Sequence, residues 1–260
     1  MFINKKMKTL LITDTHGKNP LPLIERKGED GIGRVICLGD YINSADSLDT
    51  LAKLLDLEDT IVLPGNHDFA FMKEAVHPGS KFPEFLEVSE EEYKNIAERI
   101  RNTASLREYA ERFIINTDPG RFYHCERVGE EDVFYTHAFP LEDNEGEGQH
   151  LWWRLHDPYF MLFDRKKINA SALYFFEEMG ADCPSILFRG HDHQHGLVSS
   201  LKRARNSLLF IQNHEIPKGK TTLNLNRKHI VTVGAFYTGH YAVYDTNSSQ
   251  IEFCGGEEHG

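Results

Sequence analysis

The 260-residue chain has few of the features that mark secreted or membrane proteins. Its four cysteines, at 37, 125, 183 and 254, form no CxxC pair. This usage indicates buried, reduced thiols rather than a disulfide framework. No apolar run approaches the ~20 residues that a membrane helix needs, and the apolar part of the N-terminus is too short for a signal peptide. We therefore expect a cytoplasmic protein with no membrane partner.

The chain also lacks an excess of basic residues. Lys and Arg number 29 against 40 Asp and Glu, which gives a formal net charge of −11. Proteins that bind nucleic acids generally present a basic face, so the balance argues against a nucleic-acid partner. The negative net charge does not exclude a small phosphorylated substrate, because bound metal ions would make a site locally positive. The 40% hydrophobic and 27% charged composition is that of a globular enzyme.

Five short apolar runs each end in a cluster of residues that commonly bind metals. The runs are typical of buried strands. In chain order the clusters are Asp14-Thr15-His16, Gly39-Asp40, Gly65-Asn66-His67-Asp68, His137, and Gly190-His191-Asp192-His193.

Residues 8–68 alternate strand, loop and helix, with helices expected at 21–27 and 47–55. This alternation predicts a parallel sheet, and ligands of such sheets bind just past the carboxyl ends of the strands. The clusters would then supply carboxylate, amide and imidazole ligands to two divalent metal ions at one sheet edge. The seven expected metal ligands are Asp14, His16, Asp40, Asn66, His137, His191 and His193.

Residues 70–120 interrupt the alternation. Ser89 with Glu92, and Ser105 with Glu108, each resemble a helix capping box followed by apolar residues at helical spacing. We expect a helical hairpin inserted into one domain that spans residues 1–260. It would pack on the sheet, which is compatible with a further role as a lid or a substrate-specificity element. The aromatic stretch at 152–163 favours core or a homodimer face over a base-stacking wall, and the chain after residue 196 is predicted to be antiparallel.

The motifs DTH, GD, GNHD, a lone His after a strand, and GHDH occur in the order typical of one family. Over nearly its whole length the chain resembles the calcineurin-like metallophosphoesterase superfamily. The resemblance is greatest to compact, stand-alone members described as phosphodiesterases, phosphatases or diadenosine-tetraphosphatase-like enzymes. The stretch VTVGAFYTGHYAVYD near the C-terminus resembles the corresponding part of those members.

The resemblance implies a fold and a set of residue roles. The implied fold is a four-layer αββα sandwich of two mixed sheets with flanking helices and a dinuclear metal site at the sheet edge. His67 would be the catalytic general acid, with Asp68 orienting it and raising its pKa. The first ion would be held by Asp14, His16 and His193, the second by Asn66, His137 and His191, and Asp40 would bridge the two. Mn²⁺ is the first candidate for the ions, with Fe, Zn, Co and Ni as alternatives.

One departure narrows the expected activity. Ser/Thr phosphatases of the superfamily read GDxxD followed by Arg-Gly, whereas this chain has Asn43 at the second acidic position and no Arg after it. Arg154 or Arg189 could take the place of that Arg. We expect hydrolysis of a small phosphate ester, diester or nucleotide-type substrate by attack of a metal-bridging hydroxide. The alternatives are a protein Ser/Thr phosphatase and, further off, a nuclease or a non-catalytic scaffold.

The remaining histidines lack the spacing of ligands. His195 directly follows the GHDH motif and suits either a site-lining or a structural role. His240 lies in a glycine-flanked turn where the related C-terminal stretch approaches the site. The others are expected to be ordinary residues: His124, His150, His156, His214 and His229.

Overall fold

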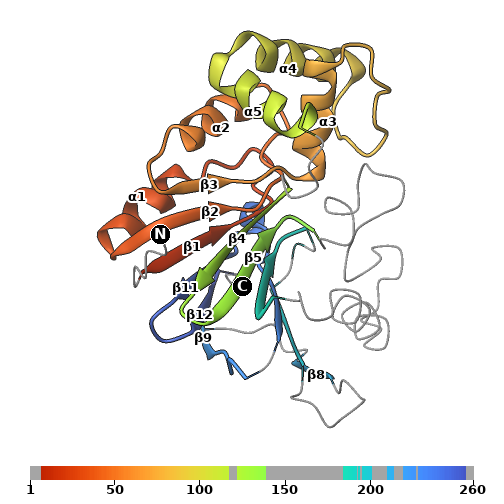
Figure 1. The fold of residues 1–260 in the computed structure, drawn as a ribbon. Helices are drawn as coiled ribbons and strands as arrows, with labels where there is room; N and C mark the ends of the chain where they lie inside the picture. Colours follow the sequence, from red (N-terminus) through yellow and green to blue (C-terminus); the bar gives the residue numbers. More distant parts are fainter. Residues whose placement is uncertain are drawn as a thin grey trace, which may run out of the picture.

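The computed structural model describes residues 7–116, 122–138, 184–191, 193, 195–200, 210–213, 219–226 and 228–255. In these ranges the chain forms two mixed six-stranded sheets with a shared apolar core between them (Figure 1). Helices cover the outer face of the first sheet over a second apolar core. The prediction of two mixed sheets with flanking helices is confirmed.

The first sheet has the strand order β3-β2-β1-β11-β12-β9. β1, β2 and β3 run parallel, as the strand–helix alternation predicts, and β11, β12 and β9 continue the sheet antiparallel. Because three neighbouring strands point the same way, the segments that follow them lie at one edge. The strands are β1 (Lys8–Ile12), β2 (Ile32–Cys37), β3 (Thr60–Val62), β9 (Gly219–Thr222), β11 (Tyr241–Asp245) and β12 (Gln250–Cys254).

The second sheet has the order β4-β5-β6-β10-β7-β8. β5, β6 and β10 are parallel neighbours, and β10 is antiparallel to β7. The expectation of purely antiparallel pairing after residue 196 is therefore wrong for β10, since a short apolar run does not reveal which strand it will join. The strands are β4 (Tyr123–Val128), β5 (Glu131–Thr136), β6 (Ile186–Arg189), β7 (Gly196–Ser200), β8 (Phe210–Asn213) and β10 (His229–Thr232).

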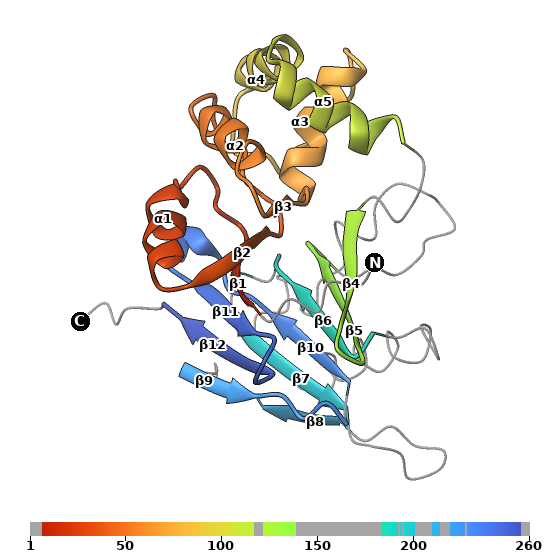
Figure 2. The same ribbon diagram turned by 60° about the vertical axis from the view of Figure 1, so that its left-hand side comes forward.

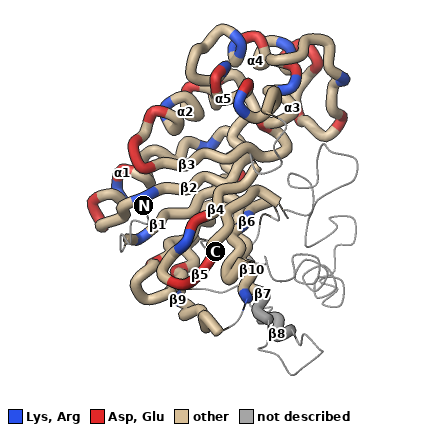
Figure 3. Tube along the Cα trace, viewed as in Figure 1, with Lys and Arg blue, Asp and Glu red and all other residues tan. Residues whose placement is uncertain are grey.

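The helices are α1 (Leu21–Glu29), α2 (Ser47–Leu55), α3 (Asn66–Val76), α4 (Glu90–Asn102) and α5 (Ala104–Ile114). α1 packs on β2 and α2 on β3, whereas α4 and α5 lie farther from the sheet and pack on α3 and α2, as a second view shows (Figure 2). Acidic and basic residues are interspersed along the helices (Figure 3). No helix in the described ranges is long and apolar enough to cross a membrane.

The predicted helical hairpin is α4 followed directly by α5. The Ser89 hydroxyl caps α4 by accepting a hydrogen bond from the Glu92 N–H at 3.1 Å. Ser105, the second predicted cap, lies inside α5, which begins at Ala104 after Thr103. α3 was not predicted, because its first turn is the GNHD motif itself. The single domain with a lid remains a prediction, and the aromatic stretch at 152–163 lies outside the described residues.

Candidate metal centre

The segments after the strands bring the predicted ligands together at one end of the sandwich. Beyond β1 and β2, the backbone N–H of Asp14 donates to the Gly39 carbonyl at 2.9 Å, and that of His16 to the Asp40 carbonyl at 2.9 Å. Beyond β5 and β6, the Gly190 N–H donates to the His137 carbonyl at 3.1 Å. Each sheet therefore continues its pairing past the strand ends and contributes ligand-type side chains to the same place.

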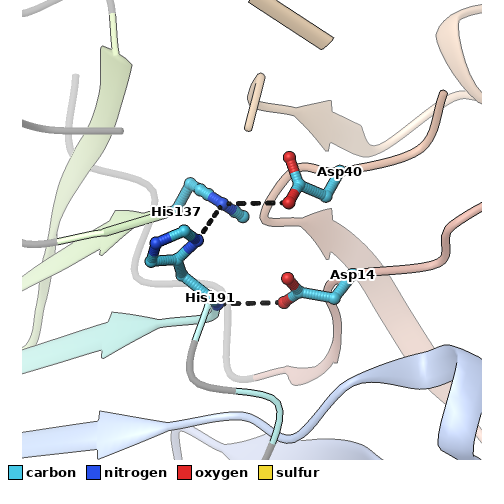
Figure 4. Close-up of side chains that lie close together, drawn as sticks. All are labelled: Asp14, Asp40, His137 and His191. Carbon is cyan, nitrogen blue, oxygen red and sulfur yellow. Dashed lines mark hydrogen bonds and ion pairs between the residues drawn. The ribbon is translucent and has the colours of Figure 1, made fainter. Parts of the chain in front are cut away.

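Four fully buried side chains form the centre of the site (Figure 4). Asp14 and Asp40 come from the first sheet, and His137 and His191 come from the second. One ligand atom of each lies within 4.8 Å of the others. His137 Nε2 is 3.0 Å from His191 Nδ1, 3.4 Å from Asp40 Oδ2 and 3.1 Å from Asn66 Oδ1.

The orientation of His137 suits a metal ligand. Its Nδ1 lies 2.7 Å from the Leu38 carbonyl, which can only accept, so Nδ1 carries the hydrogen. In the neutral imidazole, Nε2 then presents its lone pair toward His191 Nδ1. Two imidazole nitrogens 3.0 Å apart cannot both present lone pairs unless a cation or proton lies between them. That spacing also fits adjacent ligands of one ion with bonds of about 2.1 Å.

A second group shares Asp14 with the first and opens toward solvent. It consists of Asp14, His16 and His193. Asp14 Oδ1 lies 3.4 Å from His193 Nε2. Neither Asp14 Oδ1 nor His16 Nε2 has a hydrogen-bond partner, although both atoms are buried. Buried polar atoms of this kind cost free energy unless something binds them, so the donor set fits a metal ion.

The backbone of the site is strained. Seven described non-glycine residues have positive φ, and five of them are predicted ligands. A left-handed conformation costs roughly 1–2 kcal/mol for such a residue. The five are Asp14 (49°), His16 (42°), Asp40 (59°), His191 (68°) and His193 (58°). Strain gathered on polar residues in this way is typical of functional sites.

Two glycines allow the chain segments of the site to approach each other. A Cβ on Gly65 would lie 2.0 Å from Asp40 Oδ1. A Cβ on Gly190 would clash with Thr13 Oγ1 and lie 2.8 Å from Asp14 Oδ2. Any side chain at either position would displace a predicted ligand.

The buried charges shift one another's protonation. Burial alone would raise the pKa of Asp14 and of Asp40. The neighbouring imidazoles, His193 and His137 at Asp14 and His137 at Asp40, instead hold both pKa values well below their usual range. Burial opposes protonation of His137, but the two carboxylates raise its pKa to about 9. The cluster therefore attracts positive charge strongly.

Asp68 is bonded to the backbone of the loop that carries Asp40. Its carboxylate accepts four backbone hydrogen bonds of 2.7–2.9 Å, from the N–H groups of Asp40, Tyr41, Ile42 and Gly65. Burial and the charge of Asp40 raise the pKa of Asp68 to about 7, while these N–H groups act in the opposite direction. Asp68 thus holds the Asp40 loop against the start of α3, and its orientation of His67 stays a prediction.

A cavity of about 420 Å³ adjoins the exposed side of the site. His16, His67, His193 and Asn43 line it, so the second group is accessible to a small ligand. The His67 ring lies edge-on to His16, with centroids 4.9 Å apart. Asn43 also donates to the His16 carbonyl. Arg189 is fully buried and is not among the described residues that line the cavity, and Arg154 lies outside the described residues.

The C-terminal stretch contributes Tyr237, which the sequence did not single out. It follows β10 in a short 3₁₀ turn, Phe236–Thr238, and its hydroxyl lies 3.2 Å from His193 Nδ1. The tautomer of His193 sets the direction of this hydrogen bond, because Nδ1 donates to the hydroxyl only when it carries the ring hydrogen. The motif VGAFYTGHY draws attention to His240 instead, which is not among the described lining residues.

His195 has a structural role. Its Nδ1 accepts from the Gly234 N–H at 3.0 Å, and its Nε2 donates to the Cys254 carbonyl at 3.1 Å. These bonds tie the ends of β10 and β12 to the start of β7. Burial lowers the pKa of His195 to about 4, so the ring stays neutral. Of the remaining histidines in the described ranges, His229 bonds the Asn224 carbonyl and His124 stacks on Tyr135.

The fold and the site together define an α/β sandwich with a candidate metal centre at the meeting point of its two sheets. The profile of the calcineurin-like phosphoesterase family matches residues 7–195. The chain therefore belongs to this family, and the resemblance inferred from the motifs is confirmed.

Solved structures show the same fold at low sequence identity. A metallophosphoesterase from Sphaerobacter thermophilus is 17% identical with a TM-score of 0.59, and the match covers 96% of this chain and 87% of that one. A hypothetical protein from Pyrococcus horikoshii OT3 is 15% identical with a TM-score of 0.58, covering 96% and 88%. No curated protein matches the chain at a significant level of sequence similarity.

Proposed function

We propose that the protein is a metal-dependent phosphoesterase that hydrolyses a small phosphate ester, diester or nucleotide-type substrate. The observation that carries the proposal is the pair of ligand groups that share Asp14, one buried and one facing the cavity beside His67. Membership of the calcineurin-like phosphoesterase family supports the same reaction class.

The proposed metal ligands are the seven that the sequence predicts: Asp14, His16, Asp40, Asn66, His137, His191 and His193. Their mixed oxygen and imidazole chemistry suits two divalent ions, with Mn²⁺ as the first candidate. When bound, such ions supply Lewis-acid stabilisation of phosphoryl charge and make water more acidic. Asp40 is the proposed bridging ligand, and the Asp68 carboxylate positions its loop through backbone hydrogen bonds.

His67 is the proposed general acid. It is the second residue of α3, its ring lines the cavity, and its backbone N–H is held by Asp40 Oδ1 at 3.0 Å. In the reaction the bond from phosphorus to the leaving oxygen breaks, water supplies the new oxygen on phosphorus, and His67 gives a proton to the leaving oxygen. General acids of this type contribute about 10²–10⁴-fold to rate when the leaving group is a poor one.

The test is hydrolysis of bis-p-nitrophenyl phosphate and p-nitrophenyl phosphate by chelator-stripped protein, with and without added Mn²⁺. We expect metal-dependent turnover. Preference for the diester identifies a phosphodiesterase, and preference for the monoester identifies a phosphatase. No turnover of either substrate after metal addition contradicts the proposal and favours a non-catalytic scaffold.

His67→Ala tests the general acid separately from metal binding. We expect turnover of an alkyl phosphate ester to fall by about 10²–10⁴-fold, with a smaller loss for p-nitrophenyl esters, whose leaving group needs little protonation. Metal content, measured by elemental analysis, should stay at the wild-type level. An equal loss on both kinds of ester would contradict the role of proton donor.

A further inference from the structure

The side of the cavity next to His67 is apolar and is formed by the helical insertion. Phe85, Leu86 and Val88 come from the segment that joins α3 to α4, and Phe71 comes from α3 itself. Ile42, from the loop after β2, completes this wall. The Phe85 ring lies edge-on to the His67 imidazole, with centroids 5.3 Å apart. An apolar surface of this kind next to the proposed proton donor is where a leaving group would lie.

Two aromatic rings border the cavity on either side of the histidines. Phe85 is 37% exposed and contacts His67, while Tyr237 is 42% exposed and lies edge-on to both His16 and His193, with centroids 5.2 and 5.4 Å apart. Large aromatic side chains exposed in a cavity offer a planar ring both apolar area and favourable stacking. The two rings therefore mark the cavity as suited to an aromatic group.

The charge of the cavity differs from that of a polyphosphate site. The carboxylate-bearing Glu87 lies among the apolar residues of the wall, and no Lys or Arg is among the described lining residues. A phosphate on the leaving group would face this carboxylate without a basic partner from those residues. Repulsion between the Glu87 carboxylate and a phosphate in the same cavity disfavours a leaving group that carries further phosphates.

Resting on the proposed phosphoesterase function, we propose that the wall formed by Phe85, Leu86 and Val88 selects substrates whose leaving alcohol is aromatic and carries no second phosphate. Phe85 packs against the ring of the leaving group while His67 protonates its oxygen. Glu87 discriminates against phosphorylated leaving groups. The helical insertion is then a specificity element for the reaction.

The first experiment compares benzyl with methyl phosphate esters, as both monoesters and diesters. Benzyl alcohol and methanol have nearly the same acidity, so a difference in kcat/KM reports on binding of the ring rather than on leaving-group chemistry. We expect the Mn²⁺-loaded protein to prefer the benzyl ester at least about tenfold, and Phe85→Ala to remove most of that preference. Leu57→Ala is the matched control, because Leu57 is 36% exposed on the surface and does not line the cavity.

The second experiment tests the charge. Glu87→Gln should raise kcat/KM for p-nitrophenyl phosphate esters that carry an additional phosphate on the leaving ring roughly fivefold relative to the unphosphorylated ester. Metal-dependent turnover of bis-p-nitrophenyl phosphate is the reference for both experiments. If that turnover is present but the benzyl preference is absent, or persists in Phe85→Ala, the leaving-group pocket is wrong and the phosphoesterase function stands. If the reference turnover is absent, the proposed function itself fails.

Discussion

Buried charged side chains are arranged differently at the two ends of the sandwich: one end holds an ion pair and the other a cluster of metal-type ligands. At the far end, Arg34 of β2 forms a two-pronged ion pair with Glu126 of β4, with both contacts at 2.5 Å. The Tyr135 hydroxyl donates to the same carboxylate at 2.8 Å, and Arg34 also donates to Thr9 Oγ1. This pair joins the two sheets with its charges balanced inside the protein, and of its polar atoms the buried Arg34 Nε lacks a hydrogen-bond partner.

At the site end, Asp14 and Asp40 join the same two sheets through His137 and His191. Here polar atoms are left without partners, and several ligands occupy strained backbone conformations. A buried ion pair whose opposite charges balance stabilises the fold, whereas a cluster of metal-type ligands with unpartnered atoms on strained backbone requires an external partner. The difference distinguishes a structural ion pair from a binding site without reference to any motif.

The largest expected effect comes from the external partner. Metal at a hundred times its dissociation constant should stabilise the chelator-stripped protein by about 2.7 kcal/mol, a rise of roughly 5–10 °C in Tm. Asp40→Asn removes a central carboxylate, so most of the Tm gain and the metal-dependent turnover should vanish. Thermal scans with and without Mn²⁺ measure this. A full gain in the variant would mean that the Asp40 carboxylate is not needed to bind the metal.

The glycine contacts give a paired test of the two ends. Gly65→Ala places a methyl group 2.0 Å from Asp40 Oδ1, whereas Gly33→Ala on β2 meets only the Met7 Cβ at 3.5 Å. Overpacking of this kind costs about 1–3 kcal/mol. We expect Gly65→Ala to lose stability and metal affinity together, and Gly33→Ala to keep both near wild type, by urea unfolding and metal titration. Equal behaviour of the two variants would contradict the close approach at the site.

Asp68→Asn tests whether the Asp68 carboxylate supports the loop that carries the proposed ligand Asp40. The substitution turns one acceptor oxygen toward two backbone N–H groups into a donor, which should loosen the Asp40 loop. Substitution of a residue that supports metal ligands typically lowers the affinity for the metal by about 10–100-fold. Isothermal titration with Mn²⁺ measures the loss. Unchanged affinity with reduced kcat would instead support the predicted orientation of His67 by Asp68.

The smallest effect is expected at the far end, where Arg34 and Glu126 side chains are 14% and 21% exposed. Burial raises the pKa of Glu126, but the Arg34 contact outweighs it and lowers that pKa below 4.5. Its contribution to stability is therefore present above about pH 4.5 and lost as the pH falls through the folded-state pKa. Glu126→Gln should lower the free energy of unfolding by ~1–2 kcal/mol at pH 7 and flatten this acid dependence.

Chemical denaturation of Glu126→Gln and wild type from pH 7 to pH 3 measures this dependence, and metal-dependent turnover provides the control. Because the pair lies away from the cavity, kcat at pH 7 should remain at the wild-type level. A fall in turnover with no change in unfolding would show that this end also serves the site.

Local sequence signals were enough for much of the fold. Apolar runs predicted β1, β2, β3, β5 and β6, and the alternation of strand, loop and helix predicted α2 with its observed bounds. The capping signal at Ser89 was correct because the serine side chain bonds the N–H of Glu92, three residues later. Signals of this kind succeed since both partners lie within one turn of helix or one strand.

Other features required contacts between distant segments. The four backbone partners of Asp68 include residues 26–28 positions earlier, and Tyr237 lies next to His193, 44 positions away. The local sequence around Asp68 or Tyr237 does not indicate which distant residue each will contact. The parallel neighbour of β10 was missed for the same reason.

By itself the sequence determined which residue types follow each strand, and with them the family and the set of ligand-type side chains. The tertiary structure alone decided which of those side chains are buried together, which atoms lack partners, and that the α3–α4 segment lines the cavity at Phe85. The physical reason is that ligand chemistry is a property of each side chain. Which of these side chains lie close together depends instead on the packing of the two sheets and on backbone hydrogen bonds between segments far apart in the chain.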